Sequence, residues 1–360
     1  MSWLLAFVGF AVLIILHELG HFAAAKAVGM RVERFSLFFP PLLGKVKRGE
    51  TEYAIGAIPL GGYVKITGMN PAEEIPEEHQ HRAYYRQPVW KRVVVIAAGP
   101  LVNIVLAFVI LFALFAFKGQ VVSTDSVDGV QARSAAQGVL EPGDRIVAVD
   151  GVTGSTTALR RQIGTHACPA NAKTQGCVAA TAAKVTIVRD GARRTVEVSP
   201  RYDKDAQRML IGFTFGAKYD PLAPGDAASS SVTGMWNVTK GTVSAIGKLF
   251  YDSEARKNVS GIVGSYETTR QSIQQDDVVR TLTLLALISL SLAIVNLFPF
   301  LPLDGGHIFW ALAEKVRGRP IPFRVMEQAS YVGFVLVIML FAIGLTNDID
   351  RLRGEGFGVR

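Results

Sequence analysis

The stretch WLLAFVGFAVLIILHELGHFAAA, from Trp3 to Ala25, decides how the rest of this chain is to be interpreted. It is long enough to cross a bilayer, which takes about 20 mostly apolar residues, and its only ionisable side chains are His17, Glu18 and His21. Residues four apart lie on one face of a helix, about 6 Å apart along its axis. This spacing suits two imidazole ligands of one Zn²⁺, with Glu18 beside the metal as a general base.

The apolar surroundings strengthen that interpretation. An Asp, Lys or Arg inside a membrane helix costs about 2.5–3.5 kcal/mol on insertion scales, so three ionisable residues at ligand spacing are hard to explain as packing. The alternative is a hydrogen-bonded cluster that stabilises a helix bundle. We expect the segment to be retained rather than cleaved as a signal peptide, because it lacks a positive leading region and its apolar run is too long.

Three further apolar segments predict a multi-span α-helical membrane protein with four transmembrane helices. They run from Val93 to Phe117, from Thr281 to Phe298 and, shorter, from about Ser330 to Leu345. The composition agrees, since 49% of the 360 residues are hydrophobic and 19% are charged, against about 25% charged in an average soluble protein.

The net charge of +8 is interpreted as membrane topology. Basic residues gather in 26–92 and 302–329, beside the apolar segments, as the positive-inside rule requires of cytoplasmic loops. The prediction is therefore that both termini and the long segment 118–280 lie outside the cell membrane. The partner is the lipid bilayer, and no nucleic-acid partner is expected.

Segment 118–200 predicts an inserted, strand-rich extracytoplasmic domain. Two alternating runs between Val185 and Val198 are joined by Asp190-Gly191, a strong hairpin signal. Gly138 and the turn Pro142-Gly143-Asp144 precede a further strand that ends at Asp150-Gly151. This pattern resembles a PDZ domain of the bacterial protease type, and such domains bind extended peptides by strand addition.

Cys168 and Cys177 both lie in this segment, where a disulfide is permitted outside the membrane. Two free thiols are the alternative. The connector 201–280 contains a helical pattern from Val232 to Tyr251, which predicts an amphipathic helix either at the membrane surface or packed on the inserted domain.

A catalytic zinc usually has three protein ligands, and depth in the membrane indicates where the third lies. His17 follows Trp3 by about 21 Å of helix, and Asn296 follows Thr281 by about 22 Å. Pro299 and Pro302 then break the helix, and Asp304 lies in the irregular stretch that follows. Such backbone is tolerated at membrane depth only where it is buried or lines a watery cavity, which makes Asp304 the natural third ligand.

The motif from His17 to His21, together with Asn296 to Gly305 in the pattern N-x-x-P-x-x-x-L-D-G, resembles the site-2 protease family of intramembrane zinc metalloproteases (peptidase family M50), in particular its bacterial members that cleave anti-sigma factors. The resemblance implies that His17, His21 and Asp304 bind one Zn²⁺, that Glu18 activates the attacking water, and that Asn296 contacts the substrate or polarises the scissile carbonyl. It implies a membrane-dipping β-hairpin over Thr51 to Met69, with Gly61, Gly62 and Pro299 near the substrate. His307 lies outside the implied ligand set and is expected to be structural.

The expected organisation is 1–117 with the first two spans and the hairpin, a single PDZ domain over 118–200, the connector 201–280, and 281–360 with the last two spans. The expected function is cleavage of single-span proteins, such as a pre-trimmed anti-sigma factor, in the bacterial inner membrane, with the active site toward the cytoplasm and a peptide or substrate tail bound at the PDZ domain. The alternatives are a metal-ion transporter and a non-catalytic membrane protein that binds peptides.

Overall fold

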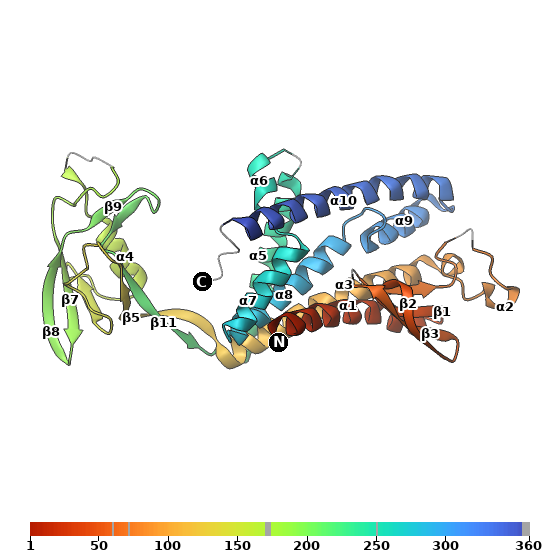
Figure 1. Ribbon diagram of the computed structural model, residues 1–360, viewed down its shortest axis with the longest axis horizontal. Coiled ribbons are helices and arrows are strands. Elements are labelled where there is room, and N and C mark those ends of the chain that lie inside the picture. The colour runs from red at the N-terminus through yellow and green to blue at the C-terminus, as the bar shows by residue number, and fades with distance from the viewer. Residues whose placement is uncertain (60, 71–72, 170–173, 250, 355–360) are drawn as a thin grey trace. The chain divides into compact units, whose positions relative to one another are not determined.

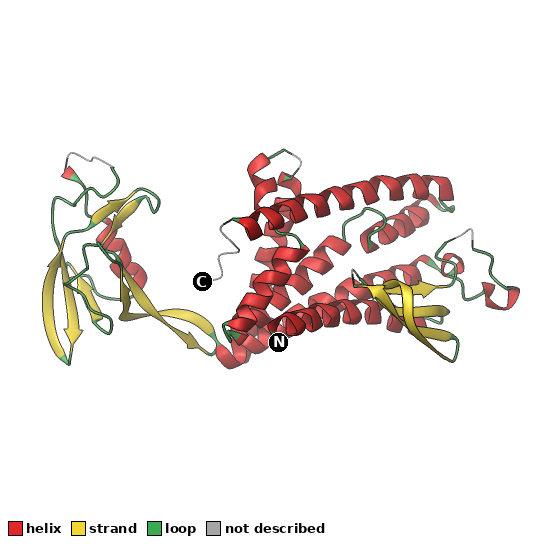
Figure 2. Ribbon diagram, in the orientation of Figure 1, coloured by secondary structure: helices red, strands yellow, loops and turns green. Residues whose placement is uncertain are grey.

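The computed structural model describes residues 1–59, 61–70, 73–169, 174–249 and 251–354. The chain divides into two compact units, one formed by Met1–Phe117 with Ala223–Arg360 and the other by Lys118–Leu222. The first unit is mostly helical and the second is mostly strand (Figures 1 and 2).

The first unit consists of helices around a small sheet. Its helices are α1 (Ser2–Ala27), α2 (Glu77–Gln80), a 3₁₀ turn (Tyr84–Arg86), α3 (Val89–Ala113) with a π-helical end (Leu114–Lys118), α5 (Pro224–Lys248), α6 (Ser253–Asn258), α7 (Ile262–Gln274), α8 (Val278–Asn296), α9 (Asp304–Arg317) and α10 (Phe323–Arg353). Its strands are β1 (Val32–Leu37), β2 (Phe39–Arg48), β3 (Thr51–Ile58) and β4 (Tyr63–Ile66).

Four helices among the described residues are long and apolar enough to cross a membrane: Ser2–Ala27, Val89–Lys118, Val278–Asn296 and Arg324–Arg353. The chain therefore has the make-up of a multi-span membrane protein with a β domain. The fourth segment is longer than its apolar core suggested, because polar residues such as Arg324 and Arg351 extend the same helix at both ends.

Helices α1 and α3 run antiparallel in close contact. Gly20 lies against Ala98 and Val102, whereas the Lys91 ammonium donates a hydrogen bond to the Val28 carbonyl at the other end of the contact. A β-carbon on Gly20 would lie 2.6 Å from the Ala98 carbonyl oxygen, so only glycine permits this separation. Small residues at helix contacts are how membrane helices approach closely.

The sheet of the first unit has the strand order β2-β3-β1-β4. Strand β3 pairs with β2 antiparallel and with β1 parallel, and β4 pairs with β1 antiparallel. The predicted hairpin over Thr51 to Met69 is wrong in this respect, because β3 and β4 are separated by β1 instead of pairing with each other. The sequence gives no local sign of this, since β1 precedes both strands and enters between them.

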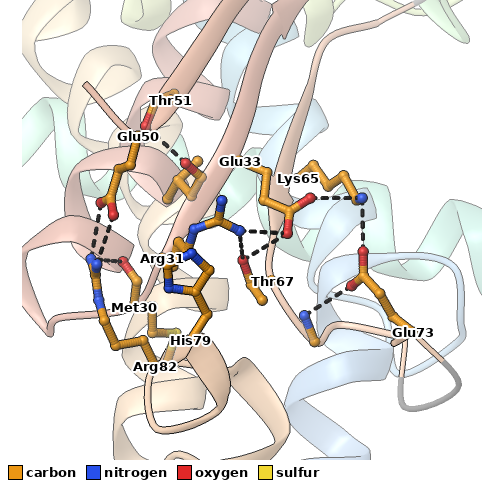
Figure 3. Close-up of polar contacts among 12 residues, drawn as sticks. Met30, Arg31, Glu33, Glu50, Thr51, Lys65, Thr67, Glu73, His79 and Arg82 are labelled. Atoms are coloured by element: carbon orange, nitrogen blue, oxygen red, sulfur yellow. Dashed lines mark hydrogen bonds and ion pairs between the residues drawn. The ribbon is translucent and has the colours of Figure 1, made fainter. Parts of the chain in front are cut away.

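One edge of this sheet is β4, which polar contacts hold in place (Figure 3). The Lys65 ammonium bridges the carboxylates of Glu33 and Glu73, both at 2.7 Å. Glu33 in turn accepts hydrogen bonds from Arg31 and Thr67. Strand β4 and the turn that follows it are thereby linked to Glu33 of β1.

A second group of charges ties the sheet to the end of α1. Glu50 accepts hydrogen bonds from Arg82 and Lys26, and these two cations hold the pKa of its carboxyl down to about 2. Arg82 also donates to the Gly29 carbonyl just beyond α1. The β2–β3 turn is thus fixed against the end of the helix that carries His17 and His21, and Figure 3 shows the Glu50–Arg82 part of this group.

The second unit is built on a five-stranded sheet of order β11-β5-β6-β7-β8. Its elements are β5 (Gln120–Val130), β6 (Arg145–Val149), α4 (Thr156–Gly164), β7 (Ala183–Arg189), β8 (Ala192–Val198), β9 (Arg201–Asp203), β10 (Arg208–Leu210) and β11 (Phe213–Asp220). The predicted hairpin is confirmed, with Arg189 opposite Ala192 and positive φ at Asp190 and Gly191. Leu159, Ile146 and Val185 belong to its core.

This unit ends at Leu222 and not at residue 200. The reason is β11, which pairs along nearly the whole of β5 and so closes the sheet with residues that the sequence had assigned to the connector. The remaining connector is helical, and the helix predicted over 232–251 is α5 (Pro224–Lys248). Cys168 and Cys177 are joined in a disulfide.

Candidate metal centre and catalytic site

Three donor atoms from two distant parts of the chain converge in the first unit. His17 Nε2 and His21 Nε2 are 3.2 Å apart, and Asp304 Oδ2 lies 3.2 Å from the first and 3.4 Å from the second. Ligand atoms about 2.0–2.2 Å from a tetrahedral zinc are roughly 3.3–3.6 Å apart. The triangle therefore has the size that Zn²⁺ requires on one face of its coordination shell.

The hydrogen bonds of His21 also fit a cation in this position. Its Nδ1 lies 2.9 Å from the Val95 carbonyl oxygen, which can only accept, so Nδ1 carries the proton. In the neutral ring Nε2 then presents a lone pair to Asp304 Oδ2. Two acceptors facing each other in a buried place require a proton or a cation between them, and a ligating histidine normally donates from its other nitrogen in this way.

The motif's glutamate is placed to act beside the triangle. Glu18 lines a cavity of about 790 Å³ together with His17, His21 and Asp304. Its carboxylate makes no hydrogen bond or ion pair with the residues that the structure describes, and it lies over Gly62, where a β-carbon would come within 2.8 Å of Glu18 Cγ. A carboxylate without a partner is free to accept a proton.

Asp304 reaches the histidines because the chain between α8 and α9 folds back on itself. Pro299 and Pro302 lie in this non-helical stretch, and Asp304 is the first residue of α9. The next two residues are glycines in tight contact, since a β-carbon on Gly305 would lie 2.1 Å from the Leu297 carbonyl oxygen and one on Gly306 would lie 2.5 Å from Leu301 N. Larger side chains would push α9, and Asp304 with it, away from α8.

The other residues predicted at the site divide into two groups. Asn296 Nδ2 lies 3.5 Å from His17 Nε2, and Asn296, Gly61 and Gly62 line the cavity. Pro299 is exposed and is not among the lining residues, whereas Pro302 and His307 are. The two glycines therefore line the cavity that contains the donor atoms, whereas Pro299 does not.

Sequence reasoning missed two contributors to the site. Gly99 of α3 faces His21 so closely that a β-carbon would lie 2.2 Å from the ring nitrogen Nε2. Helix α7 brings Ile262, Val263 and Tyr266 into the cavity wall, although its sequence predicts only a connector. A Gly-Pro pair in the middle of an apolar span was the available signal for Gly99.

Apolar helices that surround two histidines, an aspartate and a free glutamate define a membrane-embedded metallohydrolase of the His-Glu-x-x-His kind. Comparison with known proteins makes this specific. The model of Peptidase family M50 matches residues 5–340, and the chain belongs to this family. It is a zinc metalloprotease in a membrane setting.

Curated relatives that are named zinc metalloproteases match this chain along nearly its whole length. A protein of Rhizobium meliloti named "Putative zinc metalloprotease" is 31% identical over 95% of this chain and 94% of its own length. One of the same name from Nostoc is 32% identical over 98% of this chain and 97% of its own length. A third, from Campylobacter jejuni, is 29% identical over 95% and 92% respectively.

Proposed function

We propose that this protein hydrolyses a peptide bond within or next to the transmembrane segment of single-span membrane proteins, such as a pre-trimmed anti-sigma factor. The observation that carries the proposal is the convergence of the three donor atoms with Glu18 in one cavity that is walled by candidate membrane spans and by strand β4.

In this proposal His17, His21 and Asp304 hold one Zn²⁺. When bound, the metal supplies Lewis acidity that polarises the scissile carbonyl and acidifies water. Glu18 takes a proton from the attacking water at its carboxylate and passes it to the leaving amine. The Asn296 amide, beside His17, orients the substrate carbonyl.

The edge of strand β4 is the proposed place for the substrate backbone. Peptide bonds in a helix are shielded, and an extended segment can instead add to a sheet edge through main-chain hydrogen bonds. Tyr63, Val64, Ile66 and Met69 line the catalytic cavity and also a second cavity of about 510 Å³. A strand along β4 would thus pass from Gly62, beside Glu18, to the Lys65–Glu73 ion pair.

We further propose that the second unit is a PDZ domain on the extracytoplasmic side, that both termini share that side, and that the active site lies toward the cytoplasm. The positive charges of 26–92 and 302–329 support this orientation. The domain would exclude substrates whose outer portion has not been trimmed. Replacing residues 118–222 by a short linker should then permit cleavage of untrimmed substrate, and unchanged preference for trimmed substrate would contradict the filter.

The decisive test compares purified wild type and Glu18→Gln on a tagged single-span substrate, trimmed on its outer side, with the metal content of both measured in parallel. We expect each to hold one zinc per chain and only the wild type to cleave. His17→Ala is the matched control, which should lose both zinc and cleavage. Equal cleavage by wild type and Glu18→Gln, or no zinc in either, would refute the proposal.

A further inference from the structure

Asn103 stands out in the second span. It lies in α3 with an exposed fraction of 0%, and neither atom of its side-chain amide has a hydrogen-bond partner among the residues that the structure describes. The Ser289 hydroxyl donates to its main-chain carbonyl, 3.0 Å away, and leaves the side chain untouched. A buried polar group without a partner is unfavourable, because it loses its hydrogen bonds to water and gains none in the protein, so this residue needs a reason to be there.

One of the proposed zinc ligands, His17, also has a buried polar atom without a hydrogen-bond partner among the described residues. Both ring nitrogens of His21 are used, Nδ1 by Val95 and Nε2 at the donor triangle. His17 presents Nε2 to the same triangle, but its Nδ1 is buried and has no partner within the described part of the chain. A histidine that ligates a metal through Nε2 carries a proton on Nδ1 and normally donates it to an acceptor.

The packing of α1 against α3 places the side chains of Asn103 and His17 at the same height along the two helices. His21 lies against Gly99, and α1 and α3 are antiparallel. Four residues back along α1 is His17, and four residues forward along α3 is Asn103, so each is one helical turn, about 5–6 Å, from the His21–Gly99 contact in the same direction. Both side chains belong to the buried faces of their helices.

We propose that Asn103 is a positioning residue for zinc: its amide oxygen accepts the Nδ1 proton of His17, directly or through one water molecule, and so holds Nε2 toward the metal. It would do for His17 what the Val95 carbonyl does for His21. This inference rests on His17 being a zinc ligand, as proposed above.

The test measures the zinc dissociation constant of full-length protein in detergent by chelator competition. Loss of a hydrogen-bond partner behind a metal ligand typically weakens affinity 10–100-fold, and we expect this of Asn103→Leu, which keeps the size and removes the acceptor. Asn103→Asp keeps the acceptor and should stay close to wild type. Ser289→Ala removes a neighbouring buried hydroxyl and is the matched control, with little expected change. The Co²⁺-loaded proteins should show an altered ligand-field spectrum only for Asn103→Leu.

An affinity of Asn103→Leu within about threefold of wild type, or an equal loss in Ser289→Ala, would overturn the proposal. Should Asn103→Leu fail to fold, Asn103→Ala against Asn103→Asp makes the same comparison with a smaller side chain in place of leucine, and equal affinities would overturn the proposal as well. His17→Ala tests the ligand assignment separately: if it binds zinc like wild type, that assignment fails irrespective of Asn103, and this inference fails with it.

Discussion

The substitution Gly99→Ala, which adds one methyl group, should abolish zinc binding although every proposed ligand remains in the sequence. A β-carbon there would lie 2.2 Å from His21 Nε2, 2.6 Å from Cε1 and 2.8 Å from Cδ2. Atoms in comfortable contact are about 3.5 Å apart, so the imidazole or helix α1 must move by roughly 1 Å. The donor atoms are only 3.2–3.4 Å from one another, and a shift of that size takes Nε2 out of the triangle.

The expected loss of cleavage and zinc affinity is large because both depend on where the ligand atoms lie and not only on which residues supply them. A misplacement of about 1 Å can cost 100-fold in catalysis, and we expect Gly99→Ala to lose at least about that much cleavage and a comparable factor in zinc affinity. Intrinsic helix propensity works in the opposite direction, since alanine is favoured over glycine by about 0.8–1.0 kcal/mol. The metal-free protein should therefore not unfold merely because a glycine was replaced.

Zinc content, chelator competition and cleavage of a tagged substrate would be compared with the control Gly9→Ala. Gly9 lies in α1, and a β-carbon there meets only the flexible end of Leu285 at 3.2 Å, so little change is expected. If Gly99→Ala binds zinc and cleaves within about threefold of wild type, the close contact between α3 and His21 does not determine the position of the His21 ring, and this prediction is refuted.

Three other outcomes follow from contacts away from the metal. Arg92 and Glu314 form a two-pronged ion pair at 2.9 and 2.7 Å between α3 and α9. Because the pair is partly buried, Arg92→Met should destabilise the detergent-solubilised protein by about 1.5–3 kcal/mol, with partial recovery in Arg92→Glu/Glu314→Arg. Thermal unfolding that does not change would contradict this. The Arg189 guanidinium holds the pKa of Asp144 below its usual value of 3.8. The stabilisation that this carboxylate gives the second unit is therefore complete above about pH 4 and is lost as the pH falls through the lowered pKa. Arg189→Met should reduce this dependence of the unfolding free energy on acid pH in an unfolding titration. The Cys168–Cys177 disulfide joins residues nine positions apart. Its reduction should lower the free energy of unfolding of the second unit by about 2–3 kcal/mol. Identical denaturation curves with and without reductant would contradict this prediction.

The parts of the site that could be predicted are those encoded by local periodicity. The spacing of His17 and His21 on one helix face needs only the geometry of a helix. Counting residues along the two spans predicts a similar depth for His17 and Asn296, and Asn296 Nδ2 lies 3.5 Å from His17 Nε2. Asp304 could be anticipated because prolines after Asn296 forbid a continued helix. The hairpin at Asp190-Gly191 was also predictable from the local sequence, since its turn type is determined by two adjacent residues.

The parts that could not be predicted depend on which segments meet. Strand β1 enters between β3 and β4, and β11 returns to β5 from about 90 residues away; neither event leaves a mark in the local pattern. The role of Gly99 depends on the approach of α1, which a single helix does not reveal. Asn103 is an uncharged polar residue within an apolar span, which is the signal in the sequence that marks it.

These contacts explain how a hydrolytic site can be assembled inside a bundle of apolar helices. Lipid tails are as apolar as leucine, so burial of apolar surface does not press membrane helices together, and tight approach relies on small residues. Gly20 admits the Ala98 carbonyl, Gly99 admits the His21 ring, and Gly305 admits the Leu297 carbonyl, each at a separation that a β-carbon would forbid. The His-Glu-x-x-His motif supplies two ligands and a base, but the third ligand arrives only because Gly305 lets α9 begin against the end of α8. Glycines on three different helices therefore determine how closely α1, α3 and α9 approach their neighbours around the donor triangle.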